Sequence, residues 1–266
     1  MGGKMTRSIK VIFSSLLASS MLFGGGDIEI PSEETTMEET SAWAFEFEPY
    51  LMITNIDGDA KFGRLPTTNL NVDFSTILDN LDMGAMVHAE AHHKSGWGLW
   101  MDYGFMDLSN DVAPVDQISS ARVRQGVLEV MGLYRKPMAN GYIEYLAGVR
   151  WWDNDYDIGY ALPSLGLSGK ISRNVDWIDA VVGARYTYVV DENWKLRVHG
   201  DIGAGGADFT ASTTAGFVYM VNDLIDVDVK YKATWVDYTE GTRGQRDYFV
   251  YDTVTHGFIV GVNFKF

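Results

Sequence analysis

The C-terminal ten residues alternate strictly between large apolar side chains and polar or small ones. Neighbouring side chains on a β-strand point to opposite faces, so this pattern predicts a strand with one apolar and one polar face. The apolar face carries Phe258, Val260, Val262, Phe264 and Phe266. An apolar face that ends on a C-terminal Phe is typical of the closing strand of a bacterial outer-membrane β-barrel. It predicts that these five side chains face lipid.

The same alternation recurs along the chain and predicts about ten strands, with eight or twelve as alternatives. The predicted strands cover residues 43–53, 83–92, 99–105, 118–135, 141–152, 176–189, 194–205, 209–220, 225–236 and 248–266. Tight turns alternate with long links, which cover residues 57–80, 107–117, 153–175 and 237–247. An open sheet edge would leave backbone groups unpaired in lipid. The predicted fold is therefore all-β, a closed antiparallel up-and-down transmembrane barrel.

The N-terminal residues predict export from the cytoplasm. Residues 1–26 combine three early cations with an apolar run over 11–23, which is shorter than the roughly 20 residues of a membrane-spanning helix. This segment is interpreted as a cleaved secretory signal. Residues 27–41 are acidic and contain Pro31, so they predict a flexible periplasmic lead-in. Residues 42–266 remain as the barrel, which is predicted to lie in the bacterial outer membrane.

Composition narrows the possible functions. The chain has no cysteine, which excludes disulfides and thiolate metal sites. Its net charge of −15 makes nucleic acid a poor partner. Aromatic residues reach 13%, and a girdle at the lipid interfaces would use them. The tryptophans predicted to lie in this girdle are Trp43, Trp97, Trp151, Trp152, Trp194 and Trp235.

Two of the long links contain local signals. Residues 74–81 place apolar side chains at helical spacing, and Ser75 is the expected cap of a short helix in the first external loop. Residues 153–157, with the sequence D-N-D-Y-D, form an acidic patch in a predicted external loop. This patch predicts either a solvated acidic loop or a Ca²⁺ site, because a hard cation prefers carboxylate oxygens.

Several blocks of sequence between Trp43 and Phe266 are distinctive. They are W-x-F-x-x-E-P-Y-L, F-S-T-I-L-D-N-L-D-M, G-W-G-L-W-M-D-Y-G-F-M-D-L-S, G-V-R-W-W-D-N-D, W-I-D-A-V-V-G-A-R-Y and H-G-F-I-V-G-V-N-F-K-F. Together they resemble a family of uncharacterised Gram-negative outer-membrane proteins, commonly described as OmpA-like or porin-like small barrels. The resemblance implies location and fold, without a substrate or a catalytic motif.

If the apolar faces contact lipid, the opposite faces point into the barrel, and charges of both signs are expected to pair there. The predicted lumen residues are Glu46, Glu48, His88, Glu90, Asp102, Glu129, Glu144, Arg150, Asp179, Arg185, Lys195, Arg197, Asp201, Asp226, Asp228 and Lys230, together with His199 and Lys232. Arg150 and Arg185 each follow a glycine by two residues, and this spacing suggests room for water or for the arginine. The pattern fits either a filled structural barrel or a narrow pore for small hydrophilic solutes. Ten strands favour the filled interior.

The sequence predicts no metal site, no cofactor and no catalytic set. His88 and His92 lie four residues apart on a strand, about 13 Å, which is too far to share one zinc ion. No histidine converges with a nucleophile, so an enzyme is the least favoured hypothesis. Adhesion through acidic external loops remains an alternative. The expected partners are outer-membrane lipid, lipopolysaccharide and, through the C-terminal strand, the barrel assembly machinery, and the chain is expected to be a monomer.

Overall fold

A computed structural model describes residues 41–110, 118–162 and 166–266, so the predicted signal and nearly all of the lead-in lie outside the described residues. Within these described residues the backbone is almost entirely extended, with one short helix. The elements are β1 (Trp43–Phe62), β2 (Thr68–Val72), α1 (Phe74–Asp79), β3 (Leu81–His93), β4 (Trp97–Asn110), β5 (Ile118–Met138), β6 (Gly141–Leu162), β7 (Leu167–Val189), β8 (Trp194–Gly205), β9 (Phe209–Met220), β10 (Ile225–Glu240) and β11 (Phe249–Lys265).

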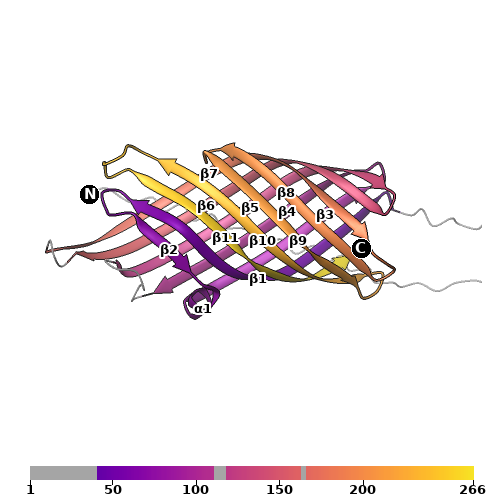
Figure 1. The fold of residues 1–266 in the computed structure, drawn as a ribbon, viewed down its shortest axis with the longest axis horizontal. Coiled ribbons are helices and arrows are strands. Elements are labelled where there is room, and N and C mark those ends of the chain that lie inside the picture. Colours follow the sequence, from indigo (N-terminus) through magenta and orange to yellow (C-terminus); the bar gives the residue numbers. More distant parts are fainter. Residues whose placement is uncertain (1–40, 111–117, 163–165) are drawn as a thin grey trace, which may run out of the picture. The chain divides into compact units, whose positions relative to one another are not determined.

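All strands belong to one antiparallel sheet that closes on itself (Figure 1). Sequential neighbours pair from β3 to β11, β1 pairs with β3, and the ring closes where β11 pairs with β1, with Leu51 opposite Val260. The sheet has 11 strands, and β2 pairs only with β1 among the described residues, so the ring itself contains ten. This confirms the predicted closed up-and-down barrel.

The two ends of the barrel differ. We call the end with the tight turns, such as the one between His93 and Trp97, the turn end, and the opposite end the hairpin end. Figure 1 shows the hairpins at the left and the C-terminus among the short turns at the right. The predicted long links are wrong in extent. Most of residues 153–175 belongs to β6 and β7, whose pairing continues to Leu162 opposite Leu167.

The alternation that revealed the other strands reverses in this extension. On β6, Tyr156 and Ile158 are buried inside the barrel, whereas Asp155 and Asp157 point outward. A lipid-facing strand carries apolar residues outside, whereas this stretch carries acids there. Its alternation therefore does not match the lipid-facing pattern, and the sequence predicts a loop instead of a strand.

The outward face is apolar as predicted from the closing strand. Phe258, Val260 and Phe266 are 54%, 46% and 76% exposed, and Val262 is exposed as well. Phe264 is half-buried. In the part of the chain that the structure describes, no helix is long and apolar enough to cross a membrane.

The short helix α1 forms where the sequence placed it, but its cap is different. The backbone N–H of Thr76 donates to the Asp73 carboxylate at 2.8 Å, and the Ser75 hydroxyl donates to the same carboxylate. Asp73 is therefore the N-cap, and the expectation for Ser75 was wrong by two residues. The hydrogen bond from the Thr76 backbone holds the pKa of Asp73 below its usual value.

The wall of the barrel is discontinuous beside α1. The turn-end half of β1, Trp43–Pro49, pairs with β3, whereas its hairpin-end half pairs with β2 over Ile56–Ala60. No pairing joins β2 to β4 within the described sheet. The helix follows β2 directly and leads into β3, and its Ile77 packs inward against Ile56 and Met106. Figure 1 shows α1 next to β2 at the lower edge of the barrel.

Candidate functional site: the filled barrel interior

The interior contains two regions of different chemistry. An ion-pair zone extends from the turn end to the middle of the barrel and contains most of the predicted lumen charges. An aromatic zone follows toward the hairpin end. Its main members are Phe62, Trp152, Tyr156, Trp177, Tyr238, Phe249 and Tyr251.

Arg150 lies at the centre of the ion-pair zone, and its side chain has no exposed surface. Its Nε donates to Glu129 at 2.9 Å on the neighbouring strand β5, and its Nη2 donates to Asp201 at 2.9 Å on β8. Its Nη1 donates to the Thr210 hydroxyl on β9 at 3.0 Å. One guanidinium thus connects four strands, and its donors bind both flanking carboxylates.

Arg185 forms a second node closer to the turn end. Both terminal nitrogens of its guanidinium bind the Glu90 carboxylate on β3, and its Nε donates to Glu144 on β6 at 2.6 Å. Glu90 also bonds the rings of His88 and His92, each at 2.7 Å. The pair joins β7 to β3, which are not neighbours in the sheet, so it crosses the lumen.

The remaining lumen charges form shorter links. Lys230 lies 2.8 Å from both Glu48 and Asp228. Lys265, which the sequence did not single out as a lumen residue, lies 2.7 Å from Asp226. Smaller contacts complete the zone: Asn263 donates to Glu46, Tyr50 donates to Asp102, and Lys232 lies 3.8 Å from Glu129.

The structure places the predicted lumen residues as follows. The buried ones are Glu48, His88, Glu90, Asp102, Glu129, Glu144, Arg150, Asp179, Arg185, His199, Asp201, Asp226 and Asp228. The partly exposed ones are Glu46, Lys195, Arg197, Lys230 and Lys232. Asp179 accepts hydrogen bonds from the Trp177 indole and the Ala207 backbone instead of a cation. The buried Nε of Arg197 has no hydrogen-bond partner among the described residues.

Sequence reasoning missed the aromatic zone. Trp177 stacks on Tyr238 with ring centroids 4.0 Å apart and on Trp152 at 5.4 Å. Trp152 is only 3% exposed, which corrects its assignment to the lipid-facing girdle. The sequence does contain a signal for this placement. Trp152 and Tyr156 lie an even number of residues from Arg150 on the same strand, so all three side chains point to the same, inward face.

The glycines before the two arginines have a different role from the one expected. A Cβ on Gly148 would lie 2.0 Å from the Val130 carbonyl oxygen, and one on Gly183 would lie 2.5 Å from that of Gly200. These positions let neighbouring backbones approach closely. They do not provide room for water.

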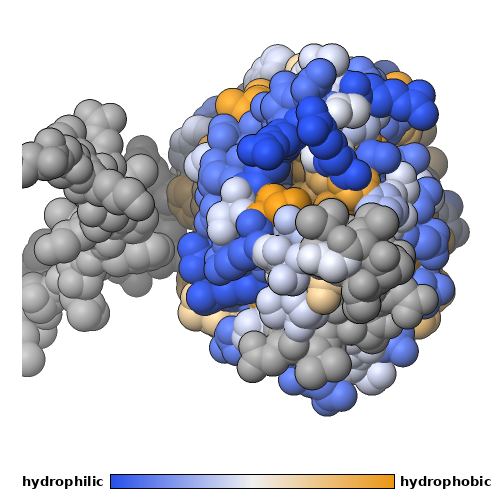
Figure 2. All heavy atoms as spheres, turned by 90° about the vertical axis from the view of Figure 1, so that its left-hand side faces the viewer, coloured by the Kyte–Doolittle hydropathy of each residue, from blue (hydrophilic) through white to orange (hydrophobic). Residues whose placement is uncertain are grey.

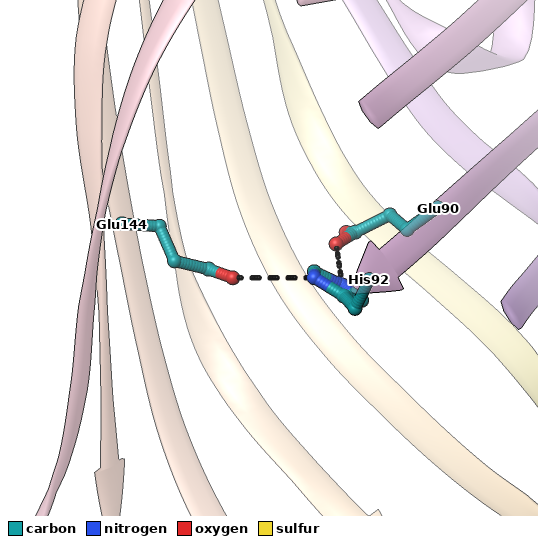
Figure 3. A group of neighbouring side chains, drawn as sticks. All are labelled: Glu90, His92 and Glu144. Carbon is teal, nitrogen blue, oxygen red and sulfur yellow. Dashed lines mark hydrogen bonds and ion pairs between the residues drawn. The ribbon is translucent and has the colours of Figure 1, made fainter. Parts of the chain in front are cut away.

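Among the described residues, Glu90, His92 and Glu144 form the group that most resembles a metal site, with ligand atoms within 4.8 Å of one another (Figure 3). Glu144 comes from β6, across the lumen, and so was not visible from local sequence. Both carboxylates already bind Arg185, and Glu144 also accepts from Arg135 at 2.8 Å. A cation would have to displace these guanidinium groups. The arrangement therefore fits an ion-pair node better than a metal centre.

The acidic patch at residues 153–157 does not form a loop. Asp155 accepts hydrogen bonds from Arg124 and Asn174, and Asp157 lies 3.3 Å from Lys170. Asp153, Asp155 and Asp157 share the outward face of β6, where residues two apart along the strand are separated by about 7 Å. Asp155 and Asp157 already pair with Arg124 and Lys170, so the patch is the outer face of a paired strand, and the Ca²⁺ site stays a prediction.

Comparisons with known proteins agree on the barrel architecture alone. No protein-family model and no curated protein sequence matches the chain. Solved structures that resemble it include the translocator domain of the autotransporter NalP from Neisseria meningitidis, with 13% identity, coverage of 86% of this chain and 90% of that chain, and a TM-score of 0.47. The toluene transporter TbuX from Ralstonia pickettii shows 10% identity, coverage of 85% and 89%, and a TM-score of 0.41. Ail from Yersinia pestis shows 8% identity, coverage of 85% and 100%, and a TM-score of 0.34. Identities and TM-scores this low carry no argument about function.

Proposed function

We propose that this chain is an integral outer-membrane β-barrel with a closed, non-conducting lumen, acting as a structural barrel. The observation that carries the proposal is the complete burial of Arg150, which lies between Glu129 and Asp201 inside the barrel. A lumen residue in an aqueous pore would keep solvent contact. Here the two carboxylates and one hydroxyl replace that solvent.

The location rests on the outward face. Exposed apolar side chains surround the cylinder, which suits lipid and not water, and the export signal predicted from the sequence agrees. Contacts with lipopolysaccharide, recognition of the last strand by the barrel assembly machinery and a monomeric state belong to the same proposal. The proposal assigns the chain no catalytic step.

The narrow pore is the second candidate, and the aromatic zone weighs against it. Trp152, Trp177, Tyr238 and Phe249 are each at most 6% exposed, and their rings contact one another across the hairpin-end half of the lumen. Closely packed apolar rings leave no continuous path of hydrogen-bonding groups for water. A hydrophilic solute would therefore meet two successive barriers.

The absence of native cysteine allows a direct test, because an introduced thiol is the only one in the protein. Met131 points inward and is 0% exposed, whereas Asn193 lies in an exposed turn. We expect Met131→Cys in the folded barrel to react with a charged, water-soluble methanethiosulfonate at least about a hundredfold more slowly than Asn193→Cys, because reaction requires opening of the packed interior. The two thiols should react alike in urea. Equal rates in the folded state would contradict a closed lumen.

A further inference from the structure

An apolar cavity of about 170 Å³ lies inside the hairpin-end half of the barrel, next to the aromatic zone. Its wall combines Ile56 of β1, Leu70 of β2, Ile77 of α1 and Met106 of β4 with residues of β5, β6 and β11. No described lining residue is charged. The site therefore excludes ions and accepts a neutral molecule.

The cavity lies where the sheet is interrupted. Its lining includes β2 on one side and β4 and β5 on the other, and α1 covers the interval in which β2 and β4 do not pair. In Figure 2, which faces the hairpin end, hydrophobic residues are visible near the middle of a largely hydrophilic surface.

The size of the cavity sets the size of the occupant. Apolar cavities of about 150 Å³ in protein interiors remain dry and accept benzene, so about 170 Å³ accommodates one aromatic ring with a small substituent. The wall also contains polar residues such as Thr76, Ser109 and Gln125, but most of the surface that faces the space is apolar. It therefore offers a water molecule few of the two to four polar partners that it needs.

One polar group in the wall lacks a partner. The Tyr156 side chain is 5% exposed, and its hydroxyl has no hydrogen-bond partner among the described residues. Buried hydroxyl groups are normally paired, so this unpaired one is a group that a ligand can satisfy. The hydroxyl has almost no surface facing the open space, so pairing requires a small shift of the Tyr156 side chain. Gln125, also in the wall, already donates to Asn154 and Tyr251.

We propose that this cavity is a binding site for a neutral single-ring aromatic molecule that bears one hydrogen-bonding substituent, such as a phenol. The ring occupies the apolar space, and the substituent pairs with the Tyr156 hydroxyl. This site is separate from the ion-pair zone and does not depend on whether the lumen conducts.

The test uses ¹⁹F NMR of 4-fluorophenol and fluorobenzene added to the full chain in lipid nanodiscs. We expect a bound signal for each probe, distinct from probe dissolved in lipid and saturating at one per chain. Ala121→Phe places a ring in the cavity and should abolish both bound signals. Ala147→Phe, with the same change on the exposed outer face of β6, should retain them.

Tyr156→Phe tests the hydrogen bond separately from the cavity. It should weaken 4-fluorophenol binding about three- to tenfold, the effect of one neutral hydrogen bond, and leave fluorobenzene within about twofold. Circular dichroism confirms that each variant is folded. The proposal is overturned if no saturable signal appears, or if Ala121→Phe binds like wild type. It is also overturned if Tyr156→Phe weakens both probes equally or neither of them.

Discussion

Replacing Arg150 with methionine is expected to lower the free energy of unfolding by about 3–5 kcal/mol. Methionine keeps much of the volume but removes the charge, so Glu129 and Asp201 lose the guanidinium that both contact at 2.9 Å. Both carboxylates are at most 4% exposed, and water cannot easily replace the lost partner. Urea titration of the protein in lipid vesicles, followed by circular dichroism, measures the change.

Arg124→Met is the matched control for this variant. The Arg124 side chain is 45% exposed and pairs with the half-exposed Asp155 and, at 3.5 Å, with Asp107. Asp107 keeps its two hydrogen bonds from Arg122, so the loss of Arg124 should change the free energy of unfolding by no more than about 1 kcal/mol. A triple variant, Arg150→Met with Glu129→Gln and Asp201→Asn, should recover part of the loss, because neither carboxylate is then left charged without the guanidinium. Equal losses for Arg150→Met and Arg124→Met would show that the central node is solvated.

Replacing Trp177 with alanine is expected to lower the free energy of unfolding by about 3–5 kcal/mol, the second large effect. The indole is 4% exposed, stacks on Trp152 and Tyr238, and donates to Asp179 at 3.0 Å. Alanine would leave a cavity in the aromatic zone and an unpaired carboxylate oxygen. Urea titration followed by circular dichroism is again the measurement, since it does not depend on tryptophan fluorescence.

Trp194→Ala provides the comparison on the outer surface. Trp194 is 43% exposed and contacts the outward-facing Phe217 and Tyr219. Removal of this side chain opens no internal cavity. Trp194→Ala should therefore lower the free energy of unfolding distinctly less than Trp177→Ala does. If the two variants lower the free energy of unfolding equally, the interior at Trp177 is not tightly packed, and the proposed apolar barrier is absent.

The parts of the fold that follow from a two-residue period were predictable from the sequence. The lipid-facing row of Phe258, Val260 and Val262 repeats every second residue, and lipid accepts only a closed sheet. The same parity identified Arg150 and Glu129 as inward residues on adjacent strands. The local pattern is sufficient for these residues, because the direction of each side chain depends only on its own strand and the two faces of that strand.

Contacts across the lumen could not be predicted in this way. Arg185 binds Glu90 from a strand that is distant in the sheet, and this approach depends on strand tilt and register around the whole ring. The hairpin extensions were missed because their apolar side chains, such as Tyr156, face the interior of the barrel, whereas acids such as Asp155 face outward. Trp152 was misassigned since an aromatic residue near a strand end fits a girdle and a core equally well.

The most direct test of the closed barrel is the current through the wild-type chain in planar lipid bilayers. A lumen filled by Arg150, Arg185 and the aromatic zone predicts a baseline without steady conductance steps, indistinguishable from that of protein-free bilayers. Circular dichroism of the same preparation must show the folded barrel. Uniform, long-lived steps from folded wild-type protein would contradict the account, because ions would then have a continuous aqueous path through the ion-pair and aromatic zones.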